Sequence, residues 1–109
     1  MKINLKSNED GIHWVALEGD LDFHSSPDVR RELAGVVEKQ PRKILVNLSK
    51  VSYIDSSGLA TFVEALQRMN RAGGKLVLTG LAPTVRGVFE IAKLDSIFTL
   101  RDTEENAFA

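Results

Sequence analysis

The chain has 109 residues, a length typical of one domain with one core, so we expect a single domain over residues 1–109. Hydrophobic residues make up 43% of it and charged residues 27%, which is ordinary for a globular protein and argues against disorder. The 14 basic and 15 acidic residues leave a formal net charge of -1. Without a basic excess to neutralise phosphates, a nucleic acid is not expected as a direct partner.

The sequence contains no cysteine, which excludes disulfides, thiolate catalysis and cysteine-based metal sites. Residues 1–6 lack the apolar run of a signal peptide. No apolar run approaches the roughly 20 residues that span a bilayer. We therefore expect a cytoplasmic protein without membrane insertion, and composition leaves its oligomeric state open.

The first predicted element is a hairpin. Residues 2–7 and 12–18 are short mixed apolar runs, and residues 8–11, Asn-Glu-Asp-Gly, have the composition of a turn between them. Its two strands should form the antiparallel edge of a sheet, because a short turn joins only antiparallel neighbours.

A helix is predicted to follow the hairpin. Ser26 is expected at its N-cap, with Pro27 at the first helical position and Asp28 in the first turn. The helix should end before Pro41. Its apolar residues recur at helical spacing and are Val29, Leu33, Val36 and Val37.

The middle of the chain predicts a buried strand and a second helix. Residues 44–48 form a continuous apolar run that suits a central strand covered on both faces. Residues 58–72 have helical periodicity, and Gly73-Gly74 supplies the stop. The expected apolar stripe of this helix is Leu59, Phe62, Val63, Leu66 and Met69.

The last third predicts a strand over residues 75–79, a helix over 83–92 and a strand over 97–100. The inner face of that helix is expected to carry Val85, Val88, Phe89 and Ala92. Residues 103–105 suggest the cap of a short terminal helix.

Strand–helix–strand units in series imply parallel pairing with right-handed crossovers. The predicted fold class is therefore α/β: a mixed, mostly parallel sheet of about five strands with an N-terminal hairpin and packed helices. No G-x-G-x-x-G motif follows a strand, so a dinucleotide-binding domain is a poor fit.

The most informative stretch is Asp55-Ser56-Ser57-Gly58, between the buried strand and the second helix. Functional sites in open α/β sheets lie beyond the carboxyl ends of strands. Backbone N–H groups at such a helix start are expected to be unpaired, so they favour an anion such as a phosphate on Ser56. Ser and Asp before a helix are also ordinary N-caps, and the residues alone leave both readings open.

Four segments together resemble the STAS family, which includes bacterial anti-sigma factor antagonists. The loop and its next residue, Asp55 to Leu59, follow a strand of the expected kind. The other three segments are residues 17–22, with Gly-Asp-Leu-Asp after the second strand; residues 72–78; and residues 83–89. The resemblance covers residues 11–100 and implies a STAS-like single-domain fold.

The resemblance implies that Ser56 is phosphorylated by an anti-sigma factor serine kinase of the histidine-kinase-like ATPase fold. The unphosphorylated form would bind this kinase and release a sigma factor, and a PP2C-type phosphatase would reset the switch. Asp22 and Asp55 match acids at the partner surface. The full predicted partner surface is Asp22, His24, Asp55, Ser56, Ser57 and Gly58, with Thr61 and Glu64 as exposed neighbours on the second helix.

Two alternatives remain. A STAS subunit of an ABC-type lipid transporter, or of another non-sigma signalling complex, would share the fold. A serine hydrolase is disfavoured, because no G-x-S-x-G elbow is present and a nucleophilic serine needs a positioned base. His13 and His24 have no further ligands at metal-binding spacing, so we expect a non-enzymatic binding module without metal or cofactor.

Overall fold

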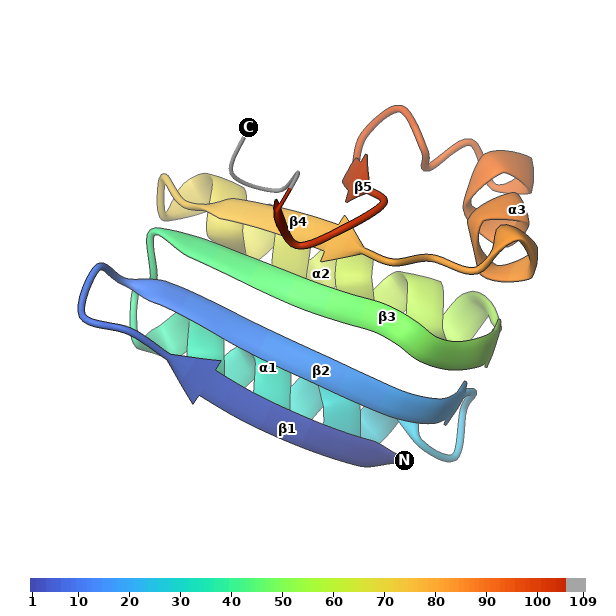
Figure 1. Cartoon of the computed structure of the whole chain (residues 1–109), viewed down its shortest axis with the longest axis horizontal. Coiled ribbons are helices and arrows are strands. Elements are labelled where there is room, and N and C mark those ends of the chain that lie inside the picture. The colour runs from blue at the N-terminus through green and yellow to red at the C-terminus, as the bar shows by residue number, and fades with distance from the viewer. Residues whose placement is uncertain (106–109) are drawn as a thin grey trace.

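The computed structural model describes residues 1–105, which form a five-stranded sheet with three helices (Figure 1). The strand order is β1-β2-β3-β4-β5; β1 is antiparallel to β2 and the other neighbours are parallel. The predicted fold class is therefore confirmed. In chain order the elements are β1 (Lys2–Ser7), β2 (Ile12–Leu21), α1 (Ser26–Glu38), β3 (Lys43–Ile54), α2 (Ser56–Arg71), β4 (Lys75–Thr79), α3 (Pro83–Ile91) and β5 (Thr99–Arg101).

The topology places α1 and α2 on the same face of the sheet. Right-handed crossovers that always advance in one direction leave their helices on one side. Figure 1 shows α1 and α2 behind the sheet, while α3 lies beside the carboxyl end of β4. The two long helices pack against each other, and their N-termini lie at the same end of the sheet.

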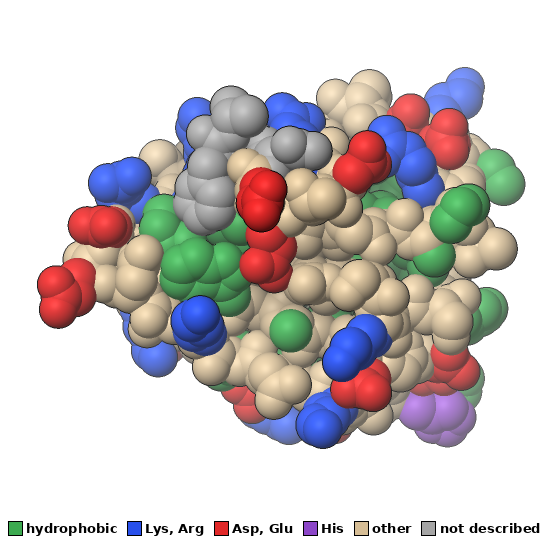
Figure 2. Space-filling model, viewed as in Figure 1, with side chains coloured by type: hydrophobic (Ala, Val, Ile, Leu, Met, Phe, Trp, Pro, Cys, Tyr) green, Lys and Arg blue, Asp and Glu red, His purple; other side chains and the backbone are tan. Residues whose placement is uncertain are grey.

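The main core lies between the sheet and the helices. On α2 and α3, Phe62 and Phe89 stack with ring centroids 6.4 Å apart, and Phe98 meets Phe89 edge-on at 5.5 Å. A smaller cluster of Ile12, Leu45 and Val77, with Trp14 packed against it, covers the other face of the sheet, where Figure 2 shows a group of apolar side chains at the surface. The prediction that β3 is buried on both faces is thus confirmed at its first half. The largest fully buried residues are Phe62, Phe89, Leu17, Leu21, Leu33, Ile44, Leu45, Leu48, Met69, Leu78, Val15 and Val29.

β3 is longer than the sequence predicted. The expected strand ended near Leu48, but the structure continues it to Ile54. Its second half pairs with the end of β2, and two register shifts interrupt that pairing. These irregularities break the alternation of buried and exposed residues, since Val51 and Ile54 are buried and the four residues around them are exposed.

The boundaries of the three helices differ from the predicted boundaries by one or two residues. The N-cap of α1 is Ser25, not Ser26, and its side chain makes no capping hydrogen bond. α2 ends as predicted: Gly73 adopts φ +79°, and its N–H and that of Gly74 donate to the carbonyls of Asn70 and Met69. Ala92 lies outside α3 and is exposed, so its predicted place on the inner face is wrong.

The last strand begins two residues later than predicted, at Thr99. The terminal helix suggested by residues 103–105 falls largely on residues 106–109, which lie outside the described residues.

Candidate functional site

The candidate site lies where β2 and β3 end together. Leu21 and Ile54 are paired as the last residues of the two strands, and the N–H of Asp55 donates to the carbonyl of Leu21 at 3.1 Å. Asp22 and Asp55 therefore leave the sheet side by side. One begins the loop that leads to α1, and the other caps α2.

Asp55 is the N-cap of α2, with an extended backbone. Its Oδ1 accepts hydrogen bonds from the N–H groups of Ser57 (2.9 Å) and Gly58 (3.2 Å) and from the Ser57 hydroxyl (2.5 Å). The Ser57 hydroxyl lowers the pKa of Asp55, and the N–H groups of Gly58, Ser57 and Phe23 act in the same direction against partial burial. The Asp55 carboxylate thus joins the loop to the start of α2.

This capping corrects one expectation. The N–H groups of Ser57 and Gly58 were expected to be unpaired, but both already donate to Asp55. A phosphate on Ser56 would therefore meet fewer ready donors than a bare helix start offers. It would stand in solvent at the surface.

Ser56 and Ser57 differ sharply in their surroundings. Ser57 is half-buried; its hydroxyl donates to Asp55 and lies 2.9 Å from the hydroxyl of Ser26 on α1. Ser56 is exposed, and its side chain forms no hydrogen bond to any of residues 1–105. Of the two, only Ser56 presents a free hydroxyl.

The loop before α1 is also held by an aspartate. Asp22 Oδ1 accepts from the N–H groups of His24 (3.0 Å) and Ser25 (3.1 Å). The Asp22 carbonyl accepts from the Ser26 hydroxyl at 2.6 Å, and the Ser25 hydroxyl donates to the carbonyl of Asp20 at 2.8 Å. The loop is rigidly connected to the end of β2.

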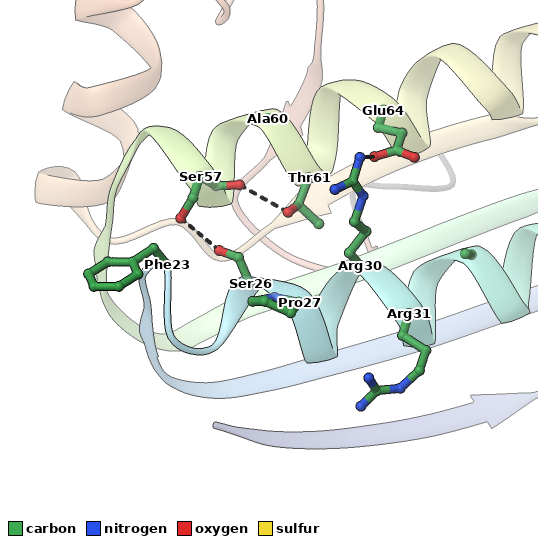
Figure 3. A pocket seen from close by; sticks show the side chains of 10 residues that line it. Phe23, Ser26, Pro27, Arg30, Arg31, Ser57, Ala60, Thr61 and Glu64 are labelled. Atoms are coloured by element: carbon green, nitrogen blue, oxygen red, sulfur yellow. Dashed lines mark hydrogen bonds and ion pairs between the residues drawn. The ribbon is translucent and has the colours of Figure 1, made fainter.

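A groove of about 510 Å³ runs between α1 and α2 from this loop (Figure 3). An ion pair of 2.6 Å between Arg30 and Glu64 connects the two helices beside it. Thr61 was expected to be exposed, and this is wrong: it is 5% exposed, because it lies on the α1-facing side of α2, where its hydroxyl donates to the carbonyl of Ser57. The groove is lined by Phe23, Ser26, Pro27, Arg30, Arg31, Ala34, Ser57, Ala60, Thr61 and Glu64.

Gly58 occupies the tightest point of the site. It is buried, and a Cβ there would lie 2.8 Å from the side chains of both Ile54 and Leu21. This glycine lets α2 approach the ends of β2 and β3 closely. Its side of the helix faces the core and offers no surface to a partner.

The structure therefore brings the predicted residues Asp22, His24, Asp55, Ser56 and Ser57 together at one end of the sheet, with Glu64 two turns along α2. Sequence reasoning missed Phe23, which is 66% exposed, and Arg30, which pairs with Glu64. Phe23 could have been noticed in the sequence as a large apolar residue within an otherwise polar loop.

Among residues 1–105, no three His, Cys, Asp or Glu side chains form a group suited to a metal ion. The described helices include none with the length and apolar character needed to cross a bilayer.

The chain belongs to the STAS domain family, whose model matches residues 4–107. BtrV of Bordetella bronchiseptica, by name a candidate anti-sigma factor antagonist, is 34% identical over 100 residues, which are 92% of this chain and 86% of BtrV. An anti-sigma-B factor antagonist of Staphylococcus aureus is 30% identical over 106 residues, covering 96% of this chain and 98% of that protein.

Solved structures agree on the fold. The anti-sigma factor antagonist SpoIIAA in its unphosphorylated form superposes with a TM-score of 0.76 at 24% identity, over 98% of this chain and 94% of SpoIIAA. The phosphorylated form of Bacillus SpoIIAA also gives 0.76, over 98% of this chain and 96% of that one. A sulfate transporter family protein of Wolinella succinogenes gives 0.78 at 19% identity, over 94% of this chain and 85% of that one.

Proposed function

We propose that this chain is an anti-sigma factor antagonist that is switched off by phosphorylation of Ser56. The observation that carries the proposal is the free, exposed hydroxyl of Ser56 beside three serines whose hydroxyls are bonded within the protein. The names of the two relatives support the class of function. The phosphorylated form of SpoIIAA supports the kind of switch.

In this proposal the unphosphorylated chain binds an anti-sigma factor serine kinase of the histidine-kinase-like ATPase fold. Binding releases the sigma factor that the kinase held. The kinase transfers the γ-phosphoryl group of ATP to the Ser56 oxygen; the hydroxyl proton leaves with a base and ADP departs. A PP2C-type phosphatase then hydrolyses the phosphoserine and restores the binding form.

The physical basis of the switch is a charge placed in an interface. A phosphoserine carries about -1.5 to -2 charges near neutral pH. At the exposed start of α2 the group stays solvated, so the fold itself should change little. Against a docked partner it would lose its water, and a buried unpaired charge costs several kcal/mol. About 3 kcal/mol already lowers affinity more than a hundredfold.

The transporter alternative has weaker support. The likeness to the Wolinella protein is at 19% identity and concerns the fold alone. A transporter subunit also needs no modifiable serine at the start of α2. Phosphate transfer by a kinase is therefore the property that separates the two proposals.

The test uses each histidine-kinase-like anti-sigma factor of the source genome, purified and incubated with this chain and ATP. Intact-mass analysis should show one added phosphate with one of them, and peptide mapping should place it on Ser56. The Ser56→Ala variant should take up none, whereas a variant of an exposed serine outside this end of the sheet, Ser96→Ala, should be labelled like the parent. Labelling of Ser56→Ala at the parent level, or no labelling of the parent by any of these kinases, would contradict the proposal.

A further inference from the structure

Phe23 is a large aromatic side chain held in solvent by a rigid loop. It is 66% exposed, and its ring lies 4.1 Å from that of His24, centroid to centroid. The N–H groups of the two residues that follow it, His24 and Ser25, donate to the Asp22 carboxylate, and its own N–H lies close enough to the Asp55 carboxylate to help lower the pKa of that group. These hydrogen bonds fix the backbone that carries the exposed ring.

An exposed aromatic group on a preorganised loop is the usual anchor of a protein interface. Aromatic residues dominate the binding energy of interfaces, because they bury a large area and lose little conformational freedom. Preorganisation lowers the entropy lost on binding. Phe23 meets both conditions and lies at the same sheet end as Ser56.

The surface next to Phe23 continues this apolar feature. Phe23 lies at the Ser57 end of the groove between α1 and α2 (Figure 3). Pro27, Ala34 and Ala60 supply apolar lining, and small side chains keep the groove open. A partner that covers Ser56 and Phe23 together would also cover the mouth of this groove.

The charges at this end indicate the chemistry of the partner. Asp20, Asp22 and Asp55 form no ion pair with any of residues 1–105. The two arginines that line the groove are already matched, because Arg30 pairs with Glu64 and Arg31 with Asp28. A partner surface that complements the three unpaired carboxylates carries lysine or arginine.

We propose that Phe23 is the apolar anchor through which this chain binds its anti-sigma factor, inserting into an apolar recess that is rimmed by cationic side chains. This inference rests on the proposed function and adds to it the residue that supplies most of the affinity. Ser56 then acts at the edge of the anchor, where a phosphate prevents the close approach that Phe23 needs.

The experiment measures affinity by calorimetric titration with the anti-sigma factor kinase that labels Ser56, in the absence of ATP. Phe23→Ala should weaken binding about 30-fold or more, which corresponds to about 2 kcal/mol. Phe23→Leu should lie between the parent and Phe23→Ala. Raising the salt concentration should weaken binding of the parent, because the rim contacts are ionic.

The matched control is Ile91→Ala. Ile91 is the last residue of α3 and is 86% exposed. Its substitution therefore removes a solvated apolar side chain that does not belong to the Phe23 loop. It should bind within about twofold of the parent. All three variants should melt close to the parent, since exposed side chains contribute little to stability.

The outcomes separate this inference from the proposed function. A parent that no kinase labels contradicts the proposed function itself. A parent that is labelled and bound, with Phe23→Ala bound equally well, overturns the anchor alone. Equal losses for Ile91→Ala and Phe23→Ala would indicate unspecific apolar contact and also overturn it. The anchor is also overturned if the parent self-associates, Phe23→Ala does not, and both bind the kinase equally well. The ring would then bind a second copy of this chain.

Discussion

Two serine pairs begin the two long helices at the same end of the sheet. Ser25-Ser26 precedes and starts α1, and Ser56-Ser57 starts α2. Both pairs follow an aspartate at a strand end. Yet three of the four hydroxyls are bonded within the protein, and that of Ser56 is free.

The comparison teaches that a helix start with serines is not enough to mark a modification site. At α1 the hydroxyls bond the carbonyls of Asp20 and Asp22 and so serve the fold. At α2 the Asp55 carboxylate caps the helix through the N–H groups of Ser57 and Gly58 and takes up only the Ser57 hydroxyl, which leaves the Ser56 hydroxyl available. Which serine stays accessible is therefore decided by the acceptors around each hydroxyl, which are carbonyls at α1 and a carboxylate at α2.

The largest expected effect is the loss of the α2 cap. Asp55→Ala removes the acceptor of three hydrogen bonds and leaves half-buried donors unpaired, so it should lower the free energy of unfolding by about 2–4 kcal/mol. Urea denaturation followed by circular dichroism measures this. Asp55→Asn keeps an acceptor and should lose less. If Asp22→Ala lowered the free energy of unfolding more than Asp55→Ala does, Asp22 and not Asp55 would be the acid that contributes more to stability.

The next effect distinguishes the two helices through their glycines. Gly58→Ala should cost about 1–3 kcal/mol of stability, because its Cβ would meet buried side chains of Ile54 and Leu21 at 2.8 Å. Gly35→Ala is the matched control in α1, where nothing lies within 4 Å, and it should stabilise by about 0.5–1 kcal/mol. Thermal melting of both variants is the measurement. Equal shifts of the same sign would show that the close packing at α2 does not limit stability.

The third effect is pH-dependent. The pKa of Asp55 is lower in the folded protein than in the unfolded chain, so its carboxylate stabilises the fold above the unfolded value of about 3.9. This contribution is lost as the pH falls below that value and through the folded pKa. Ser57→Ala removes the largest cause of the shift and should reduce the loss of stability between pH 6 and pH 3, by less than about 1 kcal/mol because solvent screens this carboxylate. Identical pH profiles in urea denaturation would mean that the Ser57 hydroxyl does not favour the ionised acid.

The smallest effect concerns the ion pair between the helices. Arg30 and Glu64 are 2.6 Å apart, but their side chains are 64% and 39% exposed. Solvent screening should hold their coupling in a double-mutant cycle below about 1 kcal/mol, and salt should weaken it further. Coupling above about 2 kcal/mol would show that this pair holds α1 against α2.

Much of the fold was predictable because the apolar periodicity and the turn residues of each short segment indicate which element that segment forms. β1 and β4 have their predicted limits, and the antiparallel edge and parallel remainder follow from the order of the elements. The end of β3 was not predictable. There the pairing with β2 contains two register shifts, and a sequence pattern of period two cannot express them.

The site was predictable in its members but not in its bonds. Asp22 and Asp55 follow paired strand ends, so their proximity follows from topology. The burial of Thr61 and the capture of the Ser57 hydroxyl depend on how α1 packs against α2, which no single helix pattern contains. Phe23 was also not predicted, because a residue in a loop belongs to no helical or strand periodicity from which its exposure could be inferred.

Every strand pairs with the strand that follows it in the chain, and the whole candidate site lies within residues 20–64. During synthesis, β2, α1, β3 and α2 therefore leave the ribosome as one uninterrupted segment. Each parallel pairing still has to close a crossover that contains a helix, and this non-local closure is expected to slow folding relative to a hairpin. We expect this segment to show the slowest amide hydrogen exchange, while β5, with three residues at the far edge, opens first.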